Sequence, residues 1–224
     1  MSRTRTLAEL REDVRKRADV ESETARHPNA DLTRYINQGG AALRDLLIEA
    51  RGRTYFRKAT PLTIATTTAT RYALGSDFLR LISVRLSGSG GYLLEPFTPQ
   101  DEAWLREPTN TATRPTHYEL QPDYIELLPA TNGGHTVVVE YIPAFADLSG
   151  DNDPLEGYDG WEEFVVDFAA CCVLTKDDEQ EALASVRKDM TVLAGRIARL
   201  APTRDAFRAE RVKDVRQAGW RYRL

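Results

Sequence analysis

Apolar residues follow two different periods along the chain. Over the first fifty residues, and again beyond residue 160, they recur every three to four positions, which predicts amphipathic helices. Between residues 55 and 143 they alternate with polar residues, which predicts strands. We therefore expect helices at both ends of the sequence and a β-rich middle.

The first helix is predicted to begin at Thr6. Thr6 and Glu9 form a capping-box pattern, in which the hydroxyl and the carboxylate each accept a hydrogen bond from a free backbone N–H at the helix start. The apolar stripe that follows consists of Leu7, Leu10, Val14 and Ala18. A charged helix with one apolar face is therefore expected here.

A second helix is predicted after the break at residues 27–29, with Asn29 or Asp31 as its N-cap and Gly52 as its C-cap. Its apolar face consists of Leu32, Tyr35, Ile36, Leu43, Leu46, Leu47 and Ala50. Gly39 and Gly40 lie in its middle, where each glycine costs about 1 kcal/mol relative to alanine. The pair indicates close approach of a neighbouring subunit's backbone or close packing within the chain, and we favour the second.

Short runs with a period of two predict about five to seven strands in the middle of the chain. Pro122-Asp123 and the segment 132–134 are turn signals. The stretch 115–143 is therefore predicted to form a three-stranded antiparallel meander. The glycine-rich segment 87–91 is expected to join two earlier strands.

Helical spacing returns after the polar linker 149–154. The next predicted helix carries apolar residues at Trp161, Phe164, Val165, Phe168, Cys171 and Cys172. In the last one, apolar positions step by three and four residues: Leu183, Val186, Met190, Leu193, Ile197 and Leu200. This pattern predicts a helix packing seam, long enough for close pairing but short for a free coiled coil.

These elements predict an α+β fold in which N- and C-terminal helices form one bundle and carry a β-rich antiparallel insertion. We assign residues 1–53 and 147–202 to the bundle, 54–146 to the insertion and 203–224 to an extended C-terminal arm. A chain of 224 residues, 42% hydrophobic and 29% charged, can bury a core without disulfides or metals.

The composition also limits the cellular setting. No run approaches the roughly 18 apolar residues of a membrane span. The polar N-terminus leads straight into an amphipathic helix, so no signal peptide is expected. The two cysteines, Cys171 and Cys172, are adjacent and cannot staple two separate segments. A reducing compartment is therefore expected.

The C-terminal arm differs in charge from the rest of the chain. Residues 203–224 carry seven basic and three acidic side chains, a net charge of +4, so the remainder has a net charge of −8. The arm could dock on a protein, contact phosphates or have no specific role. Docking on a protein is favoured, because solvent-exposed tails seldom carry tryptophan. The predicted binding residues are Arg204, Phe207, Arg208, Arg211, Arg216, Trp220, Arg221, Tyr222 and Arg223.

Motifs of catalysis are absent from the sequence. It has no P-loop, no Gly-x-Gly-x-x-Gly, no Cys-x-x-Cys and no Gly-x-Ser-x-Gly. Cys171 and Cys172 follow Phe168 on an apolar helix face, which is typical of buried, inert thiols. The acidic segment 151–159 is a poor calcium loop, since Glu156 stands where such a loop needs glycine. A solvated linker whose last carboxylate caps the next helix is the better interpretation. We expect no enzyme activity, cofactor or metal.

The order of these elements resembles the head-to-tail adaptor, or head-completion, proteins of tailed bacteriophages. The resemblance covers about residues 5–200. It rests on the segments DLTRYINQ (31–38), LRDLLIEA (43–50), RYALGSDFLRL (71–81), IELLP (125–129) and VVEYIP (138–143), with an aromatic pair at Tyr55 and Phe56. The family often has Leu-Pro-x-Asp-Phe where this chain has LGSDF (74–78), which alters a turn.

The resemblance implies a structural function. It implies a ring of twelve copies beneath the portal protein, which extends the channel for genomic DNA and presents a platform to a tail or nozzle protein. It also implies that the C-terminal arm binds the portal, and that the protein is assembled in the host cytoplasm and resides in the virion neck. The alternatives are another tail-completion protein, a nucleic-acid-binding accessory protein that uses the arm, and, least favoured, a hydrolase.

Overall fold

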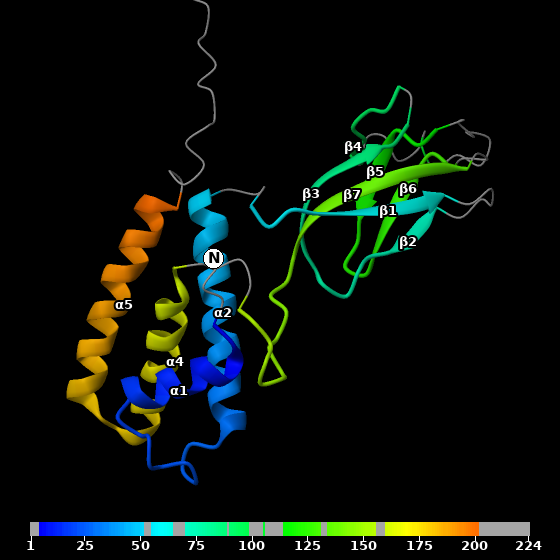
Figure 1. Ribbon diagram of the computed structural model, residues 1–224. Coiled ribbons are helices and arrows are strands. Elements are labelled where there is room, and N and C mark those ends of the chain that lie inside the picture. The colour runs from blue at the N-terminus through cyan, green and yellow to red at the C-terminus, as the bar shows by residue number, and fades with distance from the viewer. Residues whose placement is uncertain are drawn as a thin grey trace, which may run out of the picture.

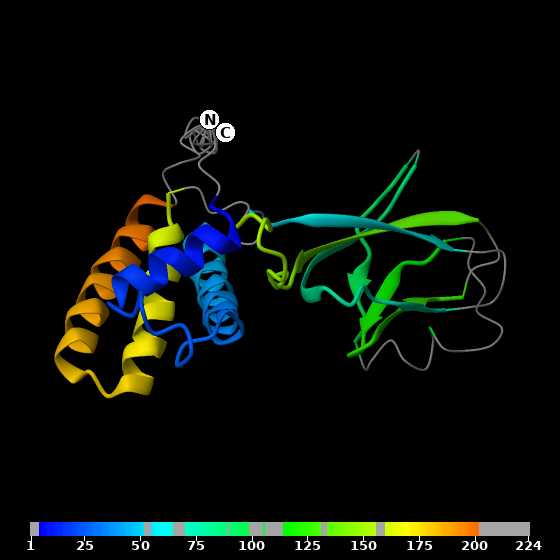
Figure 2. The same ribbon diagram turned by 60° about the horizontal axis from the view of Figure 1, so that its bottom comes forward.

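The computed structural model describes residues 5–51, 55–64, 70–88, 90–98, 105, 114–130, 134–155 and 160–201. These residues form two lobes that lie side by side, one helical and one built of strands (Figures 1 and 2). Each lobe has its own cluster of buried apolar side chains. The α+β fold class is therefore confirmed.

Four described helices make up the helical lobe: α1 (Leu7–Arg17), α2 (Asn29–Arg51), α4 (Glu162–Asp177) and α5 (Gln180–Leu200). Helix α4 contacts the other three and lies between them (Figure 1). It takes the central place because most of its circumference is apolar, and a helix that is apolar all round is stable only when it is buried. Helices from both ends of the sequence thus share one core.

The start of α1 forms as its sequence predicts. The Thr6 amide donates to the Glu9 carboxylate at 2.8 Å, and the Glu9 amide donates to the Thr6 hydroxyl at 3.4 Å. The stripe predicted from the spacing is buried in the helical core: Leu7, Leu10, Val14 and Ala18. On α2 the buried large apolar side chains are Leu32, Ile36, Leu43 and Leu47, with Tyr35, Leu46 and Ala50 partly buried against them.

The two glycines of α2 allow close packing within the chain, which is the interpretation that the sequence favours. A Cβ at Gly39 would lie 3.2 Å from Cγ1 of Val165 on α4. A Cβ at Gly40 would overlap the ring of Phe145, in the segment that leads back from the strands. Both glycines therefore make room for neighbours from distant parts of the same chain.

The strand lobe consists of two sheets over one core. Its described strands are β1 (Lys58–Ile64), β2 (Arg71–Ala73), β3 (Phe78–Leu86), β4 (Glu95–Pro96), β5 (His117–Leu120), β6 (Tyr124–Leu128) and β7 (His135–Pro143). One sheet has the order β1-β7-β3 and the other β2-β6-β5-β4. Side chains of both sheets, among them Val84, Ile125 and Val139, form the shared core.

The predicted three-stranded meander is wrong in its third strand. Strands β5 and β6 do pair antiparallel, across the turn at residues 122–123. Strand β7 instead lies between β1 and β3 and pairs antiparallel with both. Both of its edges are thereby used, and both edges of β6 are used by β2 and β5. The chain therefore crosses from one sheet to the other after β6.

Two segments hold the strand lobe against α2. On the incoming side, Tyr55 and Phe56 pack on the helical core, and the guanidinium of Arg44 lies 4.3 Å from the centroid of the Phe56 ring. On the outgoing side, the Asn37 side chain donates to the Leu148 carbonyl at 3.1 Å and accepts from the Leu148 amide at 3.0 Å. Both connections between the lobes are thus packed on the same helix.

Candidate assembly surfaces

The predicted C-terminal arm cannot be placed by the structure, because residues 202–224 lie outside the described residues. This applies to all nine residues predicted to bind a partner: Arg204, Phe207, Arg208, Arg211, Arg216, Trp220, Arg221, Tyr222 and Arg223. Their role stays a prediction. The helix from which the arm departs is described up to its end at Leu200.

The residues predicted for the helix packing seam differ in burial. Leu183, Val186 and Ile197 are buried, and Met190 and Leu193 are partly buried, all against the helical core. Leu200 lies outside this row, with 46% of its surface exposed, while Ala201 is 1% exposed. A straight α-helix drifts by about 20° per heptad, so the next inward position after Ile197 comes four residues later and not three. Extending the seam to Leu200 was therefore wrong.

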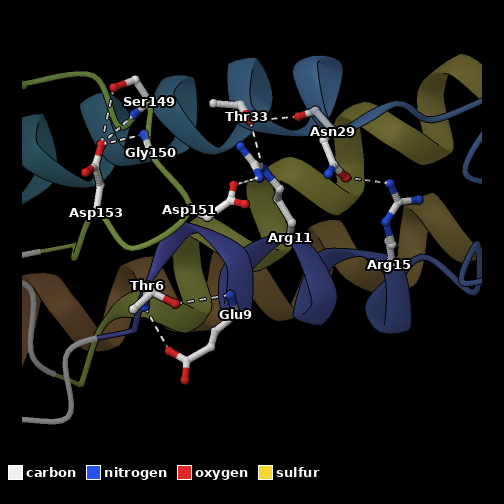
Figure 3. A network of polar contacts seen from close by, with 10 residues as sticks. All are labelled: Thr6, Glu9, Arg11, Arg15, Asn29, Thr33, Ser149, Gly150, Asp151 and Asp153. Atoms are coloured by element: carbon white, nitrogen blue, oxygen red, sulfur yellow. Dashed lines mark hydrogen bonds and ion pairs between the residues drawn. The ribbon is translucent and has the colours of Figure 1, made fainter.

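The linker that follows the strands is bound to the start of α1 (Figure 3). The amide of Leu7 donates to the Asp153 carbonyl at 2.9 Å, and the amide of Ala8 donates to the Asp151 carbonyl at 3.0 Å. These amides belong to the first turn, where a helix supplies no partner of its own. The side chains of Asp151 and Asn152 are exposed, as predicted for a solvated linker, but the backbone of residues 151–153 is bound to α1, which was not predicted. Asp159, the predicted cap of the next helix, lies outside the described residues.

The carboxylates of this linker stabilise the same junction. The side chain of Asp153 accepts hydrogen bonds from the amides of Ser149 and Gly150 at 2.8 and 2.7 Å, and these bonds lower the pKa of Asp153. Asp151 pairs with Arg11 of α1, and Arg11 also donates to the hydroxyl of Thr33 on α2 at 2.9 Å. Residues that resemble calcium ligands by type thus bind protein groups (Figure 3).

Arg17 joins three helices at the other end of α1. Its guanidinium lies 2.8 Å from Asp167 of α4 and 2.7 Å from Asp189 of α5. The Asp167 side chain is only 5% exposed, whereas that of Arg17 is 37% exposed. Burial raises the pKa of Asp167, and the hydrogen bond from Arg17 offsets part of that effect. Without Arg17, the Asp167 carboxylate would therefore be buried without a cationic partner among the described residues.

We expect Arg17→Met to lower the free energy of unfolding by about 2 to 3 kcal/mol at pH 7. This loss is smaller than the loss from breaking a fully buried ion pair, because Arg17 is partly solvated. A raised folded-state pKa means that the contribution of Asp167 to stability is present at low pH and lost as the pH rises. The loss in Arg17→Met should therefore be smaller at about pH 4 than at pH 7, because acidic pH favours the uncharged form of the carboxyl. Urea unfolding of variant and parent at both pH values measures this. Asp167→Asn in the Arg17→Met background should restore most of the stability, and an equal loss at both pH values would contradict the explanation.

A buried histidine lies in a second ion-pair network. Glu23, His27 and Asp177 bring one ligand atom each within 4.8 Å of one another, which is geometrically suitable for a metal ion. Nε2 of His27 is 2.9 Å from Asp177, but the guanidinium of Arg26 is 2.7 Å from the same carboxylate. The same guanidinium lies 3.9 Å from Glu23, so a cation of the chain itself already pairs with both carboxylates. We interpret the cluster as a junction between the α1–α2 connection and the end of α4, which the sequence analysis missed.

The thiols show no sign of activation. Cys171 is buried and Cys172 is half-buried on α4. Burial raises the pKa of both thiols, so both are protonated near neutral pH and are poor nucleophiles.

A surface groove runs between α2 and α5, with Phe164 of α4 beneath it. We call it the α2–α5 groove. Its volume is about 440 Å³, and its lining residues are Ala42, Asp45, Leu46, Glu49, Phe164, Met190, Thr191 and Ala194. The floor is apolar, and the two carboxylates stand on the α2 side. The sequence analysis missed this groove, because its walls come from segments about 150 residues apart.

The chain is similar in sequence to a family of known proteins. No helix within the described residues combines the length and apolar character that crossing a membrane requires. No curated protein sequence matches the chain. The family model described as SU10 adaptor protein matches residues 5–214, nearly the whole chain. The chain therefore belongs to the SU10 adaptor protein family, a family of phage head-to-tail adaptors.

Proposed function

We propose that this protein forms a ring in the neck of a tailed phage, joins the portal protein to the tail or nozzle, and extends the channel for genomic DNA. The match to the adaptor family over residues 5–214 is the observation that carries this proposal. The match includes the first half of the C-terminal arm. The ring of twelve copies follows from the family resemblance.

The charge distribution supports this function. The body has a net charge of −8, and DNA must pass through a channel without binding to its wall. The +4 arm is suited to an acidic surface on a partner, and arginine pairs with carboxylates in a bidentate manner. The protein is in this proposal a structural component without catalytic activity.

Negative-stain microscopy of the purified protein with purified portal rings tests the proposal. We expect an added ring of density beneath the portal. Alone at micromolar concentration, the protein should be a monomer or weak oligomer by light scattering, because acidic bodies repel one another and the portal supplies the template. A tight ring that forms without portal would contradict this assembly order, and portal rings without added density would contradict the function.

The second candidate is a nucleic-acid-binding accessory protein, and the basic arm is the observation that favours it. Phosphate contacts release counterions, so DNA affinity should then fall steeply with salt. A salt-dependent gel shift of duplex DNA, together with no binding to portal, would favour this candidate.

A further inference from the structure

The α2–α5 groove has the properties of a docking site. Leu46, Phe164 and Met190 give it an apolar floor, and small residues such as Ala42 and Ala194 leave room above them. Phe164 is nearly buried, while Leu46 and Met190 are partly exposed. An apolar side chain from elsewhere would bury these surfaces at about 25 cal/mol per Å².

Two carboxylates on the α2 wall have no cationic partner among the described residues. Asp45 and Glu49 are exposed, and neither forms an ion pair within the part of the chain that the structure describes. They are four residues apart on one helix, where like charges destabilise each other by roughly 0.2 to 0.5 kcal/mol. The α5 wall offers no charge in return, since it consists of Met190, Thr191 and Ala194. The groove is therefore suited to an occupant with an apolar side chain flanked by cations.

The beginning of the C-terminal arm has this chemistry. Arg204 and Arg208 lie on either side of Phe207 in the sequence, and with Asp205 between them the segment 204–208 has a net charge of +1. The distance is also suitable. Ala194 lies seven residues before the end of the described chain at Ala201, about 10 Å along a helix. The six residues from Ala201 to Phe207 can span about 20 Å when extended.

We propose that residues 204–208 of the arm fold back onto the α2–α5 groove of their own chain, with Phe207 on the apolar floor and Arg204 and Arg208 beside Asp45 and Glu49. The arm of the same chain is favoured over that of a second copy because a short connection gives an effective concentration of about millimolar. Free copies at micromolar concentration cannot compete with that. The docked segment fixes the place from which the distal part, with Trp220 and Tyr222, extends toward a partner.

Disulfide trapping in the full-length chain tests this without any portal protein, so its outcome is independent of the proposed function. The background carries Cys171→Ala and Cys172→Ala. One variant adds Ala194→Cys, in the groove, and Ala206→Cys, beside Phe207. The matched control replaces Ala194→Cys by Val192→Cys, two residues away on the opposite face of α5 and 64% exposed. Ala206 can reach both positions, so only docking distinguishes them.

We expect the Ala194 pair to form an intrachain disulfide at least about tenfold faster than the Val192 pair under mild oxidation, measured by mass and by mobility without reductant. Asp45→Asn with Glu49→Gln should slow the Ala194 pair about threefold or more. Asp45→Lys with Glu49→Lys should slow it further, and Arg204→Glu with Arg208→Glu should restore the rate. Ala42→Cys with Ala206→Cys repeats the test from the α2 wall.

Equal rates for the groove and control pairs would overturn the proposal. Disulfide-linked dimers as the main product would also overturn it, because the occupant would then be the arm of a second copy.

Discussion

Deletion of residues 203–224 is expected to abolish attachment to the portal and to leave both lobes folded. Each described lobe has its own apolar core, built from residues before 202. Aromatic and arginine side chains are the types that anchor interfaces, by filling pockets and pairing with carboxylates. Loss of several such anchors should weaken binding by several kcal/mol, more than rim charges alone would contribute.

Co-sedimentation of the truncated protein with portal rings, alongside a thermal melting curve, measures both parts of this expectation. Trp220→Ala with Tyr222→Ala serves as a matched variant, because it removes aromatic anchors and keeps every charge of the arm. Aromatic docking should weaken only modestly with ionic strength, whereas binding to phosphates should weaken steeply. Undiminished co-sedimentation would refute the docking arm, and a collapsed melting temperature would show that the arm belongs to the core.

Val186→Asp is expected to unfold the helical lobe. Val186 is 5% exposed on α5 and packs in the helical core, so the substitution buries a carboxylate without a partner. The cost is several kcal/mol, a large part of the stability of a typical domain. Leu193→Asp should act in the same direction but less strongly, because Leu193 is only partly buried.

Val192→Asp is the matched control, since Val192 lies on the same helix and is 64% exposed. It should change the free energy of unfolding by no more than about 0.5 kcal/mol. Helical content by circular dichroism and urea unfolding distinguish the variants. A normally folded Val186→Asp protein that merely fails to assemble would show that the seam packs between subunits.

The sequence predicted the helices well because their signals are local. The capping box at Thr6 and the stripe from Leu7 to Ala18 involve residues within a few turns of one another, and helical spacing alone identifies the buried face. The glycine pair of α2 was interpreted correctly as internal packing. Its partners Val165 and Phe145 could not be named in advance, since nothing local connects them to α2.

The arrangement of strands could not be predicted in the same way. Alternation in β7 shows that Val137, Val139 and Tyr141 share a buried face, but it does not show which strands lie at its edges. By its alternation alone, β7 could join either sheet. The tertiary packing determines that it pairs with β1 and β3. The same limitation explains why the backbone hydrogen bonds of residues 151–153 were not predicted, because their partners at the start of α1 are about 145 residues earlier.

The candidate sites also differ in whether local sequence reveals them. Composition and charge identified the C-terminal arm, because clusters of arginine and aromatic residues are visible in any sequence. The α2–α5 groove and the His27–Asp177 pair were invisible, since each arises only when α2 or its preceding turn meets the C-terminal helices. The prediction that Leu200 ends the buried seam is a smaller error, because Ala201 is buried there instead. It arises because the inward positions of a real helix drift away from an ideal heptad.

The hydrogen bonds from Leu7 and Ala8 to the linker at residues 151–153 have a consequence for synthesis on the ribosome. Helix α1 emerges first, yet the groups that complete its first turn and the helix α4 that covers its apolar face are translated more than 140 residues later. The strand lobe, complete at Pro143, can fold earlier on the nascent chain. We therefore expect α1 and α2 to remain exposed during most of translation, and the helical lobe to close last, after α5 has left the exit tunnel.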